Sequence, residues 1–209
     1  VTRWGREAGL AVTIDKIGNG FMRRPGRNNG LPPIVAGSHI DTQPTGGKFD
    51  GNFGVLAALE VVRTLNDRRI ETEAPIEVAF WTNEEGSRFV PVMMGSGVFA
   101  KAFTLEHAYA AKDSEGTSVK DELQRIGYIG DEEPGSSKVT PAALAALAGM
   151  VAAKAITQGA ARQVLEAPPP PQPLDWRNPA SGAGGTLLVI GQPKRQGFVE
   201  CRRVRSTVF

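Results

Sequence analysis

Apolar residues in the first half of the chain follow two periods, one typical of buried strands and one typical of a helix. Residues 33–36 and 76–81 are short, mostly apolar runs, as in strands that are covered on both faces of an α/β sheet. Between them, apolar residues recur at helical spacing over residues 55–65. The order strand, loop, helix, strand predicts a βαβ unit with two parallel strands.

Shorter elements are predicted on both sides of this unit. Residues 2–8 have the pattern of a helix that ends at Gly9, and residues 11–16 and 20–24 alternate like a hairpin across Gly18 and Asn19. Downstream, the pattern predicts helices over residues 95–103, 105–111 and 118–125, a turn over 113–116, an N-cap near Thr117 and a stop at Gly127.

The composition changes at Pro134. Residues 141–164 are rich in alanine, residues 168–171 are a proline run, and only residues 186–190 have the pattern of a strand. Residues 1–133 carry 15 Lys and Arg against 19 Asp and Glu, whereas residues 134–209 carry 9 against 3. We therefore expect a folded α/β domain over 1–133 and a poorly ordered Ala/Pro/Gly/Arg-rich tail over 134–209.

The composition also limits the class of protein. The 209 residues are 41% apolar, which is enough for a core, and no run reaches the roughly eighteen apolar residues that a membrane helix needs. We expect a soluble cytoplasmic protein with no membrane partner. Cys201 is the only cysteine, which excludes an intrachain disulfide and a cysteine-based zinc site within one chain. The basic cluster at residues 194–205 has only Phe198 interleaved with it, so we expect no nucleic-acid partner.

Candidate ligands for metal ions follow both predicted strands. His39, Asp41 and Asp50 lie within the glycine-rich segment GSHIDTQPTGGKFDGNFG, and Glu84 and Glu85 come directly after the second strand. The carboxyl ends of parallel strands meet at one edge of a sheet, where open α/β sheets bind ligands. We therefore expect these five side chains to converge.

These residue types suit a hydrolytic centre with two metal ions. Such a centre needs a carboxylate that bridges the ions and terminal His or carboxylate ligands on each. Asp50 is the natural bridge, His39 a terminal ligand, and Asp41 the acceptor of the second ring N–H of His39. Of Glu84 and Glu85, one would ligate an ion, while the other takes a proton from the attacking water and passes it to the leaving nitrogen. Taken alone, each has an ordinary alternative, a satisfied buried histidine or a solvated carboxylate pair, but their combination favours a metal centre.

Two other enzyme motifs are incomplete. Gly95-Ser96-Gly97 lacks the outer glycine of a serine-hydrolase elbow because position 94 is methionine. Lys48 is followed by Phe49 rather than Ser or Thr, so the glycines before it do not form a phosphate-binding loop.

At these residues the chain resembles the M20-type metallopeptidase clan, and within it the hydantoinase/carbamoylase family of zinc amidases. The resemblance runs from about residue 2 to residue 131 through AGLAVTIDKIGN, GSHIDTQPTGGKFDG, GVLAALEVVRTL, TNEEGSRF and GSGVFA. It implies part of a zinc-peptidase-like catalytic domain, with βαβ units in a mixed sheet. It also implies two divalent metal ions, zinc or manganese, cobalt or nickel. In the family pattern His39 is a terminal ligand, Asp50 the bridging ligand, Glu85 a ligand of the second ion, Glu84 the general acid and base, and Asp41 the partner of His39.

The resemblance implies a metal-dependent amidohydrolase that acts on non-peptide C–N bonds, with a small N-carbamoyl amino acid or ureido compound as substrate. Gln43-Pro44-Thr45 is closer to the carbamoylase and ureidopropionase branch than to the allantoate branch. Three alternatives stay open: a non-catalytic fragment or pseudoenzyme, an allantoate amidohydrolase, and an aminopeptidase or dipeptidase of the same clan.

The sequence departs from the family pattern after residue 131. The family carries a ligand histidine in a Leu-His-Ile-Glu-Gln-Gly segment, an inserted lid and dimerisation domain through which it forms homodimers, and a last ligand histidine. We expect these to be absent here, because the one other histidine, His107, fits neither motif and has the pattern of a surface residue. We hypothesise that the tail results from a frameshift, a retained intron or a faulty gene model.

Overall fold

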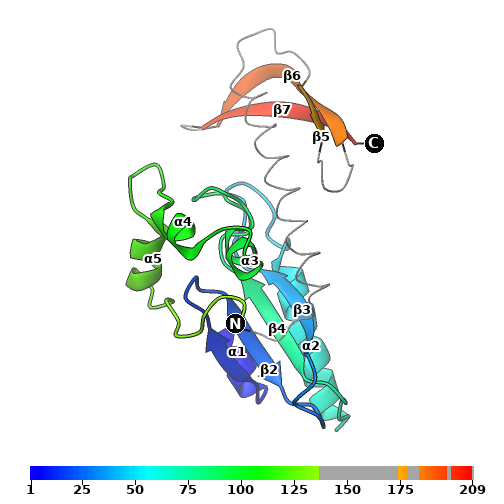
Figure 1. Ribbon diagram of the computed structural model, residues 1–209. Coiled ribbons are helices and arrows are strands. Elements are labelled where there is room, and N and C mark those ends of the chain that lie inside the picture. Colours follow the sequence, from blue (N-terminus) through cyan, green and yellow to red (C-terminus); the bar gives the residue numbers. More distant parts are fainter. Residues whose placement is uncertain (137–173, 178–183, 197–198, 209) are drawn as a thin grey trace. The chain divides into compact units, whose positions relative to one another are not determined.

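The computed structural model describes residues 1–136, 174–177, 184–196 and 199–208, and the chain divides into two compact units, Val1–Ala148 and Gly149–Phe209 (Figure 1). Each unit is treated by itself. The predicted division of the chain after residue 133 stays a prediction. Within the described residues, no helix has the length and the apolar character that crossing a membrane requires.

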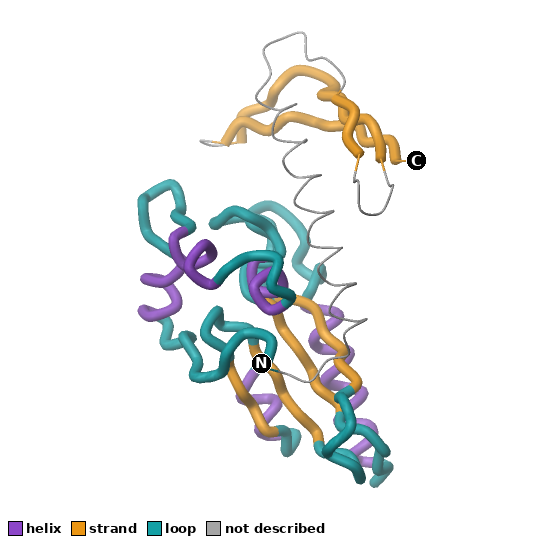
Figure 2. Tube along the Cα trace, in the orientation of Figure 1, coloured by secondary structure: helices purple, strands orange, loops and turns teal. Residues whose placement is uncertain are grey.

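A four-stranded mixed sheet forms the centre of the first unit. Its strands are β1 (Ala11–Ile14), β2 (Gly20–Arg24), β3 (Ile34–His39) and β4 (Ile76–Trp81), in the order β1-β2-β4-β3. β3 and β4 are parallel and are joined by the crossover helix α2 (Asn52–Asp67), whereas β1–β2 and β2–β4 are antiparallel. The predicted hairpin and βαβ unit are therefore confirmed, and Figure 2 shows their arrangement.

Helix α2 covers one face of this sheet. Its buried stripe includes Val55, Leu59 and Val62, which are 0–1% exposed and pack with Met22 of β2 and Val78 of β4. These helix positions are spaced by three and four residues and so lie on one side of the helix. Burial of this stripe, more than helix propensity, fixes α2 against the sheet.

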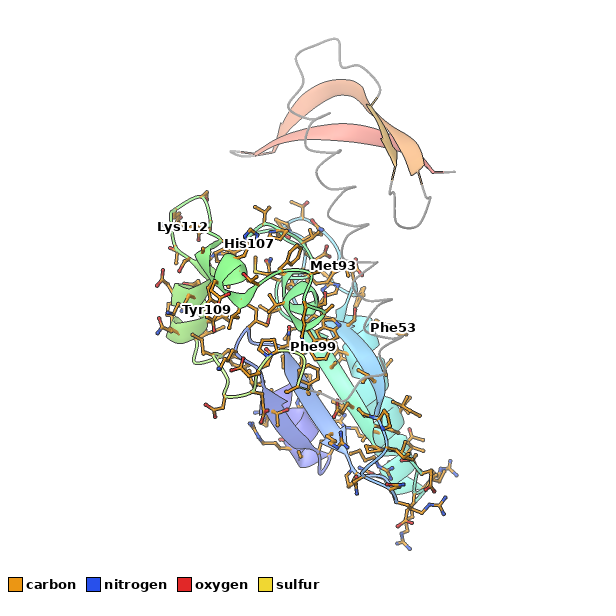
Figure 3. All side chains as sticks on the ribbon, viewed as in Figure 1. Phe53, Met93, Phe99, His107, Tyr109 and Lys112 are labelled. Carbon is orange, nitrogen blue, oxygen red and sulfur yellow. The ribbon has the colours of Figure 1, made fainter. Side chains whose placement is uncertain are left out.

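The opposite face carries an aromatic cluster. Phe21 neighbours Met22 in β2, so its side chain points to the other side of the sheet. The ring of Phe21 lies 5.8 Å from that of Trp81 and 5.5 Å from that of Phe99, measured between centroids. Phe99 is the last residue of α3 (Met94–Phe99), so this short helix is held against the end of β4 (Figure 3).

Three further short helices lie among residues 1–136 of the first unit. α1 (Thr2–Glu7) precedes the sheet, and α4 (Leu105–Ala110) and α5 (Val119–Arg125) follow α3. α5 begins with a capping box in which Ser118 and Asp121 satisfy each other's backbone N–H groups, one residue after the predicted cap. The predicted helix over 95–103 ends earlier, at Phe99, because the chain turns at Lys101 with a φ of 59°. His107 lies on α4 and is exposed, as predicted.

The second unit contains a three-stranded antiparallel sheet. Its strands are β5 (Leu174–Arg177), β6 (Gly184–Gln196) and β7 (Val199–Val208), in the order β5-β6-β7. The predicted strand over 186–190 lies within β6, but the hydrophobic pattern does not predict β5 or β7. β7 carries three arginines among ten residues, which hides the alternation that indicates a strand. The alanine-rich segment 141–164 and the proline run 168–171 lie outside the described residues.

Candidate metal centre

The ends of β3 and β4 bring the predicted ligands together. His39 is the last residue of β3 and is paired in register with Trp81, the last residue of β4. Glu84 and Glu85 follow three and four residues after Trp81. One potential ligand atom from each of His39, Glu84 and Glu85 lies within 4.8 Å of the others. These three side chains are what we call the metal centre, and their convergence follows from the parallel pairing of the two strands.

The ring of His39 is oriented by its neighbour in the next loop. Its Nδ1 lies 2.9 Å from the main-chain carbonyl oxygen of Asp41, and its Nε2 lies 3.3 Å from Oε2 of Glu84. A proton on Nδ1 that is donated to the carbonyl leaves the lone pair of Nε2 facing the glutamate. A lone pair and a carboxylate oxygen repel each other unless a proton or a cation lies between them. His39 is 4% exposed, so bulk water does not relieve this repulsion.

Gly51 makes room for this ring. It lies just before α2, with a φ of 70°, and a Cβ atom built on it would be 2.4 Å from both Nδ1 and Cε1 of His39. Only glycine adopts this backbone conformation at low cost and also leaves the space free. The glycine after Asp50 in the sequence motif is therefore a packing requirement of the histidine.

The carboxylate of Asp41 holds the backbone on which the two glutamates sit. Its Oδ1 accepts a hydrogen bond from the N–H of Glu84 at 3.2 Å, and its Oδ2 accepts one from the N–H of Glu85 at 3.0 Å. Asp41 Oδ1 lies 3.4 Å from Nδ1 of His39, farther than the Asp41 main-chain oxygen. Asp41 thus contacts the ring of His39 most closely through its main-chain oxygen, while its carboxylate joins the loop after β3 to the loop after β4.

Glu85 has one satisfied and one unsatisfied oxygen. Its Oε2 accepts a hydrogen bond of 2.6 Å from the side-chain amide of Gln43, while its Oε1 is buried without a hydrogen-bond partner. A buried carboxylate oxygen without a partner is costly, and binding a cation removes that cost. The donor set of one imidazole and two carboxylates also suits a divalent ion such as zinc. The residues present therefore fit a metal ion.

Asp50, the expected bridging ligand, lies at the rim of the centre. Its Oδ1 is 4.0 Å from Nε2 of His39, and its side chain is 68% exposed. It is not part of the compact group of three. The structure thus brings Asp50 close to His39 but leaves it more solvated than a ligand that bridges two ions.

The loop over residues 82–95, which we call the glutamate loop, is closed at its base. The N–H of Gly95 donates to the carbonyl of Thr82 at 2.8 Å, and the N–H of Met93 donates to the carbonyl of Glu84 at 2.7 Å. Asn83 donates its side-chain amide to the carbonyl of Phe89 at 2.8 Å and has a φ of 49°. Asparagine tolerates this left-handed region better than most residues, which is the one sequence signal for its role.

Arg88 fastens the glutamate loop to the helical part of the unit. Its guanidinium lies 2.8 Å from Oδ2 of Asp113 and 2.8 Å from Oε2 of Glu122 on α5. Arg125 and Arg88 hold the pKa of Glu122 at about 2, because both guanidinium groups stabilise the charged carboxylate. The sequence places Arg88 near the centre, but only the fold reveals its partners.

Sequence comparison identifies the family of this chain and several relatives. Residues 35–173 match peptidase family M20/M25/M40. An N-carbamoyl-L-amino-acid amidohydrolase of Rhizobium meliloti is 59% identical over 136 residues, which are 65% of this chain and 33% of that protein. An allantoate amidohydrolase of Bacillus subtilis is 36% identical over 120 residues, 57% of this chain and 29% of that protein.

A solved structure shares the fold of the first unit. The crystal structure of an amidase of the hydantoinase/carbamoylase family from Burkholderia multivorans matches with a TM-score of 0.64 and 60% identity, over 65% of this chain and 33% of that one. The chain thus spans about a third of the length of these relatives. The resemblance stated from the motifs is confirmed, and the chain belongs to peptidase family M20/M25/M40.

Proposed function

We propose that this chain carries the metal-binding part of an amidohydrolase that cleaves a linear, non-peptide C–N bond. The observation that carries the proposal is the group of His39, Glu84 and Glu85, in which His39 and Glu85 are buried and Glu85 Oε1 has no hydrogen-bond partner. A buried acceptor beside an imidazole lone pair is a site for a divalent cation.

Each residue has its own part in the proposed reaction. His39 would hold a metal ion through Nε2 and Glu85 through Oε1, with Asp50 at the rim as the proposed bridging ligand. Bound divalent ions supply a polarised substrate carbonyl and a water whose pKa is brought down to about 7. Glu84, whose side chain is 13% exposed, takes the proton from the attacking water and returns it to the leaving nitrogen.

The proposed substrate is an N-carbamoyl-L-amino acid. Hydrolysis of its carbamoyl C–N bond yields ammonia, carbon dioxide and the free amino acid. The name and the 59% identity of the Rhizobium meliloti relative support this substrate over allantoate, since the allantoate amidohydrolase of Bacillus subtilis is 36% identical. Dimer formation is a prediction from the family resemblance.

A non-catalytic metal-binding chain is the second candidate. The exposure of Asp50 and the match to only a third of the relatives favour it, because a two-ion centre needs further ligands. We propose that residues 1–133 are part of a catalytic domain, and that the rest of such a domain is needed for turnover.

Metal titration together with an assay of ammonia release from N-carbamoyl-L-amino acids tests both candidates. We expect Zn²⁺ or Co²⁺ to bind the chain, and His39→Ala to abolish that binding. The matched control is His107→Ala, because His107 lies on α4 away from the centre and is expected to leave binding unchanged. Turnover that Glu84→Gln abolishes would establish the amidohydrolase. Metal binding without turnover would support the non-catalytic chain, and no binding would refute both.

A further inference from the structure

We propose that Asn19, held by Asp15, is a positioning residue that fixes both ends of the glutamate loop and thereby the geometry of the metal centre. The inference rests on the proposed metal centre, but it concerns residues that no ligand motif includes. Asn19 lies in the turn between β1 and β2, and it is 0% exposed.

A single side-chain amide reaches both ends of the loop. Oδ1 of Asn19 accepts a hydrogen bond of 3.1 Å from the N–H of Thr82, and Nδ2 donates one of 3.0 Å to the carbonyl of Gly95. Thr82 and Gly95 are also bonded to each other. The two chain segments that enter and leave the loop are thus joined to a third segment, which comes from the turn of the hairpin.

Asp15 decides which way the amide of Asn19 points. The Nδ2 of Asn19 donates to Oδ2 of Asp15 at 2.9 Å, and Oδ1 of Asp15 accepts from the backbone N–H groups of Asn19 at 2.8 Å and Ile17 at 3.1 Å. Above about pH 7, where Asp15 is ionised, its carboxylate only accepts hydrogen bonds, so it requires the donor end of the amide. The opposite orientation would place Nδ2 against the N–H of Thr82 and Oδ1 against the carbonyl of Gly95.

The backbone at Gly95 packs tightly against the side-chain amide of Asn19. A Cβ atom on Gly95 would lie 2.1 Å from Oδ1 of Asn19, so the loop approaches the amide more closely than any other residue at position 95 allows. Asp15 is 1% exposed, so this network lies in the interior, where satisfied hydrogen bonds are strong and unsatisfied ones costly.

The position of the loop matters because Glu84, the proposed base, and Glu85, the proposed ligand, come two and three residues after Thr82. Metal ligands must be held within about 0.5 Å of their working positions by the groups behind them. Asp41 supports the backbone of Glu84 and Glu85 from one side, and Asn19 fixes the base of their loop from the other. Loss of such supporting hydrogen bonds typically weakens metal binding by about 10- to 100-fold.

Two variants and two controls test the proposal. Asn19→Ala removes the amide, and Asp15→Asn keeps the shape but places a donor against Nδ2 of Asn19. As a matched amide control, Asn66→Ala removes bonds to Ala8 and Arg24, which lie outside the loop. Val62→Ala is the control for lost stability. Val62 lies on α2 and is buried against the sheet, so its truncation destabilises the fold without touching the glutamate loop. We expect both test variants to bind Co²⁺ at least about ten-fold more weakly, with an altered visible absorption spectrum. The controls should keep the spectrum and the affinity, whatever their Tm.

Hydrogen exchange of the amides in residues 82–95 gives a readout that needs no metal. We expect faster exchange there in Asn19→Ala and Asp15→Asn than in Val62→Ala at equal stability. Unchanged exchange and unchanged Co²⁺ affinity in the two test variants would overturn the inference. If the unaltered chain binds no Co²⁺ while the loop exchange still responds to Asn19, the proposed function fails and the positioning of the loop stands.

Discussion

For Glu85, the sequence predicts the chemical role of the side chain but not its surroundings. The motif identifies it as a candidate ligand, but its environment is visible only in the fold: Gln43 pairs with one oxygen, and the other is buried without a partner. The sequence gives no signal for the contact between Gln43 and Glu85, because the two residues lie 42 positions apart along the chain. The contacts of Asn19 with Thr82 and Gly95 are not predictable for the same reason, since hydrogen bonds between distant segments produce no sequence motif.

Replacing Glu85 by Gln should act in opposite directions with and without metal. The amide removes a buried negative charge, so we expect the metal-free chain to gain stability. The same change removes a ligand, so added Zn²⁺ no longer raises the Tm. Thermal unfolding with and without Zn²⁺ measures both effects. Retention of the full Zn²⁺-induced rise in Tm would argue against Glu85 as a ligand.

At the scale of elements, the long periodic segments were predictable and the short ones only in part. β4 and α2 have apolar patterns long enough to identify, and the pairing of β3 with β4 follows from the crossover. The end of α3 and the path of the glutamate loop depend instead on left-handed residues such as Asn83, Met93 and Lys101. Such conformations are set by tertiary contacts, and the hydrophobic periodicity of the sequence does not predict them.

The glycines between β3 and α2 offer a matched pair of substitutions. Gly51→Ala forces a side chain into a φ of 70° and against the ring of His39, so we expect a loss of more than about 1 kcal/mol in the free energy of unfolding and weaker metal binding. Gly46→Ala lies in the same loop, and a Cβ there meets nothing within 4 Å, so it should be neutral for both. Denaturant unfolding and metal titration compare the two. Equal effects would contradict the role of Gly51 in seating the histidine.

At the scale of the whole molecule, one buried carboxyl couples stability to pH. Burial raises the pKa of Asp15 from 3.8 to about 7, against the opposing effect of hydrogen bonds from Asn19, Ile17 and Gly18. The folded chain therefore binds a proton that the unfolded chain releases above about pH 4. The contribution of Asp15 to stability is full below that pH, declines as pH rises toward 7, and is level above it.

The free energy of unfolding should accordingly fall between pH 4 and 7, by up to about 1.4 kcal/mol per pH unit from this group. Asp15→Asn removes the titrating proton and should flatten that slope, even though it disturbs the amide of Asn19. Urea unfolding at several pH values, for the chain and the variant, measures the difference. An identical slope in both would place the pH dependence elsewhere.

β3 is one of the two outer strands of the sheet formed by residues 1–136, and Ile34 at its start is 63% exposed. An outer strand accepts a further strand along its free backbone groups. Because His39 is the last residue of β3, a strand added in parallel would end beside the metal centre. Extension of the sheet at β3 would thus bring new side chains close to His39.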